Sequence, residues 1–517
     1  ADDQWTRIQN QGMIYLKAEQ PSLEVPIEMG STWRFFKGKT APSVEWINPS
    51  FDDLSWTASS APFRFGDGTG GIELTDMLNN YTSIFLRKTF TVNMPDSLIS
   101  ECNATMVIDD GYKIWLNGKE ITSYNIPLSV KYNSLASSAV EMQTISNSFK
   151  IEDVGLKNGQ NTICVQVLNC SLTSSDLYFD MMLTLNKKLP KAPEVKFSKP
   201  GGYYNAKFNV TLSGGQDGDT IKYTLDSSDP QTSSTAILAV SPVTIVIDPD
   251  DNTRIVKTPG IVVRAVVQKT GYNSGNPESR TYLFLEKVKT QVYPGGTWPS
   301  SAVNNQIMDY DVNQSVVSQY SSDFSKAFTT IPTVCLVTDN IGLFDASQGM
   351  YVNALNHGES WEKAASIELI NTDNTEAFAS GIGLRIRGGW SRHPDNPKHA
   401  FRVFFKDKYG KKKLKYPIFG EDAAQTFDKF DLRCAQNYSW SYYHDNMLTY
   451  AQDETCRDIQ GLMGHTYTRS RYCQLFLNGM YWGLYEFMER PEANFAESYK
   501  GGDKDDYDVI KVATDNS

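Results

Sequence analysis

Residues 383–391 read GLRIRGGWS, residues 396–405 read NPKHAFRVFF, and residues 472–489 read YCQLFLNGMYWGLYEFME. Apolar and polar residues alternate in the first two segments, a period of two that predicts a pair of β-strands. In the third segment, two apolar runs flank Asn478-Gly479, a dipeptide that strongly signals a β-hairpin. The three segments therefore predict a sheet that contains at least two strand pairs.

The order and spacing of these segments resemble those of the CotH-kinase family, secreted protein kinases related to spore-coat protein H. That family carries an R-G-[NG]-[SW]-S turn, a P-K-x-x-[FY]-R strand and an F-x-N-G-x-Y-x-G-L-Y-x-x-x-E hairpin, which residues 387–391, 397–402 and 476–489 match. The resemblance implies a kinase-like N-terminal lobe within residues 287–517. It also implies Mg-ATP-dependent phosphorylation of Ser or Thr on an extracellular or envelope protein.

A nucleotide kinase needs backbone donors around the phosphates, a lysine on the phosphate oxygens and a carboxylate that orients this lysine. The two glycines of the first segment would let the backbone approach an anion closely. By resemblance, Lys398 is the phosphate ligand, a helix over residues 441–458 carries its carboxylate partner, and the end of the hairpin faces the adenine. The predicted ATP site comprises Arg387, Gly388, Gly389, Ser391, Lys398, Asp445, Glu454 and Glu489.

Each of these residues also has a purely structural interpretation. Gly388 and Gly389 suit an ordinary hairpin turn, and a lysine at the start of a strand commonly faces solvent. Asp445 suits the first turn of a helix, where the helix dipole favours an acid. Glu489 suits the end of a strand, paired with a nearby arginine.

The family's catalytic loop, an [HN]-x-D-x-x-x-x-N motif, and its later metal-binding aspartate do not follow the hairpin in this sequence. We therefore expect only the nucleotide-binding lobe in these residues. Either the natural polypeptide continues past Ser517 or catalysis has been lost. The abrupt ending at Asp515-Asn516-Ser517 favours continuation.

Residues 30–188, after an N-terminal segment at residues 1–29, predict a β-sandwich. Turn signals such as Asn117-Gly118 separate alternating runs at residues 84–92, 104–108, 113–116 and 161–167. The Asp109-Asp110-Gly111 turn and the Leu116-Asn117-Gly118 hairpin resemble those of galactose-binding-like jelly-roll domains.

The loops that carry Asp67, Asp109 and Asp110 are expected on the surface of this sandwich. Several oxygen ligands there could hold Ca²⁺ or a sugar, because hard cations prefer oxygen. The alternative is that these side chains only hydrogen-bond to their own turns.

Residues 189–286 predict a smaller immunoglobulin-like sandwich that begins with a linker stiffened by Pro190 and Pro193. The strings YTLDSSDP at residues 223–230 and VVRAVVQKTGY at residues 262–272 resemble the C-terminal module of chitobiase and hexosaminidase enzymes. Such modules act as spacers or docking elements. The predicted architecture is therefore two all-β sandwiches followed by an α+β kinase-like domain.

Composition restricts the possible partners and location. The 517-residue chain has a formal net charge of −11 and five His, which argues against nucleic acid as a partner because phosphate backbones require a basic face. No apolar run approaches the ~20 residues that span a bilayer. The leading hypothesis is a secreted or cell-surface bacterial kinase. The alternatives are a non-catalytic structural, adhesive or glycan-binding surface protein and an accessory module of a polysaccharide-degrading system.

Overall fold

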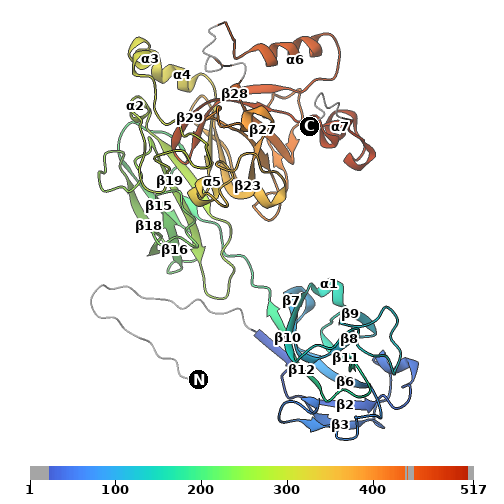
Figure 1. The fold of residues 1–517 in the computed structure, drawn as a ribbon. Coiled ribbons are helices and arrows are strands. Elements are labelled where there is room, and N and C mark those ends of the chain that lie inside the picture. Colours follow the sequence, from blue (N-terminus) through green and yellow to red (C-terminus); the bar gives the residue numbers. More distant parts are fainter. Residues whose placement is uncertain (1–22, 437–438, 440–446, 511–517) are drawn as a thin grey trace. The chain divides into compact units, whose positions relative to one another are not determined.

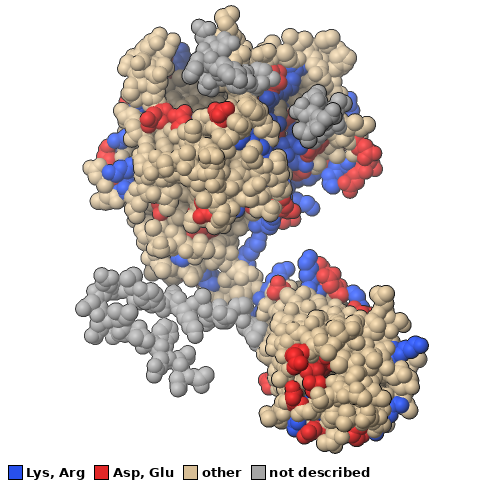
Figure 2. Space-filling model, in the orientation of Figure 1, with Lys and Arg blue, Asp and Glu red and all other residues tan. Residues whose placement is uncertain are grey.

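The computed structural model describes residues 23–436, 439 and 447–510, and the chain divides into two compact units after Pro190 (Figure 1). Strands dominate both units, and the helices are short. The predicted β-rich, multi-domain fold class is confirmed. Charges are distributed unevenly: Figure 2 shows a patch of acidic side chains on the visible face of the first unit and basic side chains near α6 (Gln452–Leu462) and α7 (Ala493–Lys500) of the second.

The first unit is a β-sandwich. Its elements are β1 (Leu23–Ile27), β2 (Thr32–Lys37), η1 (Val44–Ile47), β3 (Thr57–Ser60), β4 (Phe63–Phe65), β5 (Ile72–Glu73), β6 (Ser83–Val92), η2 (Asp96–Leu98), β7 (Ile99–Asp109), β8 (Gly111–Leu116), β9 (Lys119–Tyr124), β10 (Gln143–Phe149), α1 (Ile151–Val154), β11 (Gly159–Leu168) and β12 (Leu177–Lys187). One six-stranded sheet has the order β10-β7-β12-β4-β5, with β1 beside β12, and the other has the order β3-β2-β6-β11-β8-β9. The four runs that the sequence predicted as strands fall in β6, β7, β8 and β11.

The second unit begins with a smaller sandwich. Its elements are β13 (Lys196–Phe197), β14 (Gly202–Tyr203), β15 (Phe208–Ser213), β16 (Thr220–Thr224), β17 (Ile237–Val240), β18 (Val243–Ile247), β19 (Gly260–Gln268), β20 (Glu278–Leu283) and α2 (Leu285–Val288). The sheets have the orders β13-β15-β18 and β14-β20-β19-β16-β17. The rest of this unit is built on a closed barrel.

Seven strands close the barrel in the order β21-β22-β23-β24-β27-β29-β28. They are β21 (Thr333–Val337), β22 (Lys363–Ile370), β23 (Glu376–Arg387), β24 (Ala400–Phe404), β27 (Lys429–Cys434), β28 (Ser470–Leu477) and β29 (Met480–Met488). Parallel pairing of β21 with β28 completes the circle. Around it lie α3 (Gln314–Gln319), α4 (Phe324–Thr329), α5 (Asn340–Phe344), η3 (Glu359–Trp361), η4 (Trp390–Arg392), β25 (Leu414–Lys415), β26 (Thr426–Phe427), α6, α7 and η6 (Lys504–Asp506).

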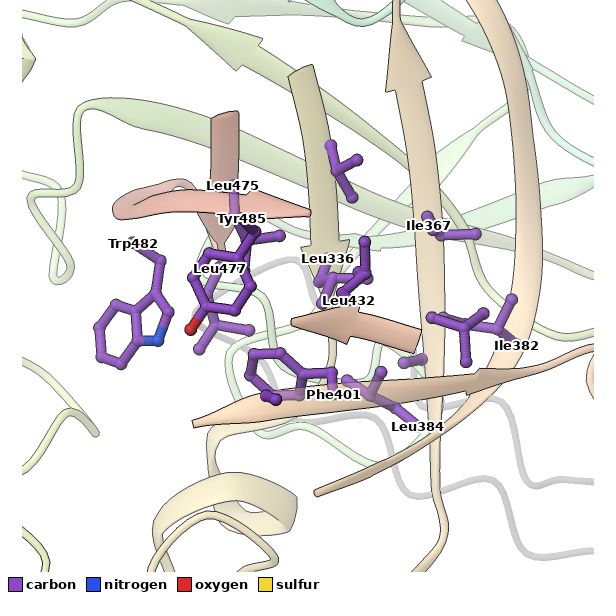
Figure 3. Close-up of a cluster of buried hydrophobic side chains, with 14 of the residues drawn as sticks. Leu336, Ile367, Ile382, Leu384, Phe401, Leu432, Leu475, Leu477, Trp482 and Tyr485 are labelled. Atoms are coloured by element: carbon purple, nitrogen blue, oxygen red, sulfur yellow. The ribbon is translucent and has the colours of Figure 1, made fainter. Parts of the chain in front are cut away.

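Alternation of residue type sends apolar side chains into the barrel. Figure 3 shows Leu336, Ile367, Leu384, Phe401 and Leu432 directed from different strands into one interior, where all five are fully buried. Both predicted strand pairs are present, because β23 pairs with β24 and β28 pairs with β29. The interior is therefore a packed hydrophobic core, and polar side chains of the same strands point outward.

The smaller sandwich and the barrel pack directly on each other. Thr281 on β20 donates a hydrogen bond from Oγ1 to Oε2 of Glu368 on β22 at 2.7 Å, and Gly260 N donates to Gly479 O at 2.8 Å. Burial raises the pKa of the Glu368 carboxyl to about 7. These two parts form one compact unit, whereas the domain limits drawn from the sequence at residues 29, 188 and 286 stay predictions.

The helix predicted over residues 441–458 is displaced. Residues 440–446 lie outside the described residues, and α6 begins only at Gln452. Residues 447–451 precede α6, and Met447 among them is 83% exposed, so the predicted helix is wrong for this segment. An acid in the first turn favours this later start. Asp453 suits the positive end of the helix dipole there and forms ion pairs with Arg433 and Arg457.

Candidate functional site

A cavity of about 620 Å³ lies beside the start of β24. Residues from several segments of the second unit line it, and its polar and aromatic side chains include Asp309, Trp390, Asp395, Asn396, Lys398, Gln436, Tyr450 and Trp482. Aromatic faces and hydrogen-bonding groups thus border the same space. This combination is typical of sites for small molecules.

Lys398 is the only cation among the residues that line this cavity in the described part of the chain. Its Nζ lies 3.8 Å from the centroid of the Trp482 ring and donates a hydrogen bond to the backbone oxygen of Asp309. Burial lowers the pKa of the Lys398 ammonium to about 8. An ammonium carries three donors, so one acceptor leaves donors available for a ligand in the cavity.

The backbone around Lys398 is held by two buried tyrosines. Tyr351 accepts a hydrogen bond from His399 N at 3.0 Å and donates to Pro397 O at 2.7 Å. Tyr485 donates to His399 O at 2.8 Å. Sequence reasoning missed Tyr351 because it lies 48 residues before His399 and no local pattern connects the two.

The glycine turn supplies only one side chain to the cavity. Gly388 has a φ of 108°, and a Cβ atom there would lie 1.9 Å from Ser391 Oγ, so the turn requires glycine. Ser391 Oγ donates back to Arg387 O at 3.3 Å, while Arg387 Nε pairs with Asp431 Oδ2 at 2.9 Å. These residues and Gly389 do not line the cavity, whereas Trp390 of the same turn does.

The predicted carboxylates lie elsewhere. Glu454 on α6 does not line the Lys398 cavity; burial and the nearby charge of Glu486 raise the pKa of its carboxyl. Glu489 is buried, and its oxygens accept hydrogen bonds from Tyr499 Oη and from Arg469 N. Asp445 lies outside the described residues. Among the described residues, no carboxylate forms an ion pair with Lys398, so the expected lysine–carboxylate pair is not observed there.

The acids of the first sandwich were expected on its surface, and this is wrong for Asp109 and Asp110, which are each 2% exposed. Asp110 is buried because its oxygens accept hydrogen bonds from Val140 N at 2.7 Å and Cys170 N at 2.6 Å, which fastens two loops. Burial is the main cause that raises the pKa of Asp109 to about 7, and the negative charge of Asp176 is the second.

Asp67, by contrast, is exposed, and its charge also acts on Asp109. Within the described part of the chain, no group of three or more His, Cys, Asp or Glu side chains is arranged to hold a metal ion. A calcium ion or sugar at this end of the sandwich stays a prediction. No helix within the described ranges is long and apolar enough to cross a membrane.

Two protein families match parts of the chain. Residues 384–517 match the family described as CotH kinase protein, and residues 199–279 match the chitobiase/beta-hexosaminidase C-terminal domain. The CotH and chitobiase resemblances are therefore confirmed: the chain carries a CotH-type region that follows a chitobiase-type module. The resemblance of residues 30–188 to galactose-binding-like domains stays a prediction. The matched families suggest an extracellular or surface protein. No curated protein matches the chain.

Several solved glycoside hydrolases share a distant structural similarity with the chain. A β-glucuronidase from Bacteroides uniformis is 13% identical over 51% of this chain and 32% of its own, with a TM-score of 0.24. A family 2 glycosyl hydrolase from Bacteroides cellulosilyticus is 15% identical over 50% and 36%, with a TM-score of 0.23. A β-glucuronidase from Ruminococcus gnavus is 10% identical over 62% and 56%, with a TM-score of 0.24. The chain thus spans between 32% and 56% of these enzymes, and at TM-scores this low the similarities carry no conclusion about fold or activity.

Proposed function

We propose that the cavity beside Lys398 is the nucleotide site of a CotH-type protein kinase. The single observation that carries the proposal is the Lys398 ammonium, which is held at a cavity of about 620 Å³ with unused donors and, among the described residues, without an ion-paired carboxylate. Asp309 and Asp395 also line this cavity, and the charge of Asp309 favours the ammonium form of Lys398. An anionic ligand would add charge-assisted hydrogen bonds to the donors of Lys398 that the protein leaves unused. The match of residues 384–517 to the CotH kinase family supports the same assignment.

The residues around the cavity could divide the binding of ATP between them. Lys398 would contact phosphate oxygens, and the tyrosine-held backbone of residues 397–399 would keep its position fixed, which is the main contribution that a protein makes to phosphoryl transfer. Trp390 is 54% exposed at the cavity and offers a face on which a base could stack. Mg²⁺, when bound with the nucleotide, would neutralise part of the phosphate charge.

The proposed reaction is phosphorylation of Ser or Thr on an extracellular or envelope protein, by a secreted or cell-surface protein. The two sandwiches would then display or anchor the kinase region. This proposal rests on the CotH and chitobiase matches, since modules of the second kind act as spacers or docking elements. The alternative is a non-catalytic structural, adhesive or glycan-binding surface protein.

ATP binding by the whole chain distinguishes these possibilities. Titration calorimetry with MgATP should show binding to the wild type, and Lys398→Ala should weaken it by about tenfold or more, because a charge-assisted contact is lost. Lys222→Ala is the matched control: Lys222 lies on the smaller sandwich, where its Nζ bonds only to Gln231 O, and its loss should change nothing. Equal affinity in Lys398→Ala, or no binding at all, would leave the scaffold or adhesive role as the better account.

A further inference from the structure

A second, smaller cavity in the barrel region has a strongly cationic lining. It measures about 90 Å³ and shares no lining residue with the cavity beside Lys398. Arg385, Arg392 and Arg402 line it, and the exposed His357 lies at its rim. Among the described residues, no carboxylate lines this cavity. Three guanidinium groups therefore border one small space without an acid.

Strand pairing brings two of these arginines together. Arg385 on β23 lies opposite Arg402 on β24, so the two side chains stand side by side on the outer face of the barrel. Their neighbours in the same strands, such as Leu384 and Phe401, point into the core. Like charges directly opposite each other destabilise a sheet unless something compensates them.

Carboxylates outside the cavity compensate these charges only in part. Glu362 accepts Nε of Arg385 at 2.9 Å and Nη2 at 2.6 Å, but it also pairs with Lys406 at 2.8 Å. Asp431 accepts a hydrogen bond from Nε of Arg402 at 2.7 Å, and it also forms an ion pair with Nε of Arg387 at 2.9 Å. The Nη1 atoms of Arg385 and Arg402 make no hydrogen bond within the described residues.

The third arginine has no carboxylate partner among the described residues. Arg392 is 6% exposed and donates to the backbone oxygens of Ala354, Asn356, Ile386 and Gly388. Burial, together with the charges of Arg402 and Arg387, lowers the pKa of its guanidinium to about 10. A full positive charge thus lies against the cavity, balanced only by carbonyl dipoles.

We propose that this arginine pocket, formed by Arg385, Arg392 and Arg402, binds a phosphate group, either as the free ion or as a monoester. Guanidinium groups suit the oxygens of phosphate because their N–H donors are fixed in a planar fork. The volume of the pocket, about 90 Å³, suits a phosphate group. A site for one water needs roughly 10–15 Å³, and a tetrahedral oxyanion takes the place of only a few waters. The site stands independently of the proposed nucleotide site.

Titration calorimetry with inorganic phosphate on the whole chain tests the pocket. Arg385→Gln should weaken phosphate binding by about tenfold or more. This substitution leaves Glu362 paired with Lys406 and hydrogen-bonded to Tyr409, so the fold should persist, which the thermal unfolding midpoint checks. Arg64→Gln, a paired arginine of the first unit, should leave phosphate affinity unchanged.

His357 gives an independent measurement should Arg385→Gln fail to fold. The charge of Arg392 lowers the pKa of this histidine, and a bound anion should raise it again. Phosphate itself gains negative charge between about pH 5.5 and about pH 8, so the comparison of two proteins is the informative quantity. The ratio of phosphate affinity at about pH 5.5 to that at about pH 8 should be roughly threefold lower in His357→Gln than in the wild type. The other charged groups at the pocket are the three arginines, with Glu362 and Asp431 behind two of them. His393→Gln is the matched control, because His393 does not line the arginine pocket and stacks on Trp390 instead.

Two outcomes would overturn the proposal: no phosphate binding by the wild type, or equal affinity in the wild type, Arg385→Gln and His357→Gln. Competition by phosphoserine separates the two sources of the group. If phosphoserine displaces phosphate, the pocket takes a monoester through its His357 rim. If only inorganic phosphate binds, the pocket takes the free ion.

Discussion

Arg392, which is buried, and Lys398, which is half-buried, lie six positions apart in the chain, and their surroundings differ. Arg392 donates four hydrogen bonds to backbone oxygens, so almost all of its donors are used inside the protein. Lys398 donates to one backbone oxygen and otherwise faces Trp482 and a cavity. Arg392 therefore mainly holds the backbone together, and it brings its charge and one remaining donor to the arginine pocket. Lys398 uses one of its three donors inside the protein and has the others available to a ligand.

The largest expected effect is on Arg392. Arg392→Ala would leave four backbone oxygens without their donor in a buried site and should destabilise the second unit by about 3 kcal/mol. Urea denaturation followed by tryptophan fluorescence measures this change. Lys398→Ala is the matched comparison and should change stability by no more than about 1 kcal/mol. The variant loses one hydrogen bond and a cation–π contact, but it also removes the cost of taking a charge out of water, and the two effects offset each other. Equal destabilisation by the two variants would remove the distinction between them.

The second prediction concerns the pH dependence of stability at Lys398. Its pKa is about 8 when folded and near the ordinary lysine value of 10.5 when unfolded. Between these values the unfolded chain binds one proton more than the folded chain, so stability rises with pH in this window, by at most about 1.4 kcal/mol per pH unit. Wild type should therefore gain stability relative to Lys398→Met as the pH rises from about 8 to about 10.

The difference in unfolding free energy between the two proteins at each pH cancels the contributions of tyrosines and other lysines that titrate in the same range. Lys222→Met, which removes a lysine of the smaller sandwich that donates to Gln231 O, is the control substitution. A constant difference between wild type and Lys398→Met would show that the ammonium is well solvated. Lys398 would then lose the feature that makes it a candidate ligand for phosphate.

Local patterns in the sequence predicted the strands well, because strand alternation and the Asn-Gly turn act over a few residues. Asn478 and Gly479 take φ values of 49° and 79°, and the hairpin forms around them as expected. The motif also pointed to Lys398 at the start of β24. The closure of the barrel could not be predicted, since it depends on β21 meeting β28 at a distance of about 140 residues along the chain.

The surroundings of the site could not be predicted for the same reason. The partners of Lys398 are Asp309 and Trp482, which come from segments far away in the sequence. Asp110 looked like a surface turn residue, yet it is buried because Val140 and Cys170 present backbone N–H groups to it. A buried acid with such partners cannot be told from an exposed one by its local sequence.

The smallest expected effect is at Glu489, a buried anion whose situation resembles that of Arg392. Both of its carboxylate oxygens are used, one by Tyr499 Oη and the other by Arg469 N at 2.8 Å, and burial raises the pKa of its carboxyl. Glu489→Gln keeps one oxygen acceptor and replaces the other with an amide, so we expect a loss of about 1 kcal/mol in unfolding free energy.

ATP affinity should stay unchanged in Glu489→Gln, because Glu489 does not line the Lys398 cavity. Calorimetry on the folded variant measures this affinity. A tenfold loss of ATP affinity without a loss of stability would instead support the role at the adenine that the sequence motif predicted, and it would show that satisfied hydrogen bonds alone do not mark a structural residue in this barrel.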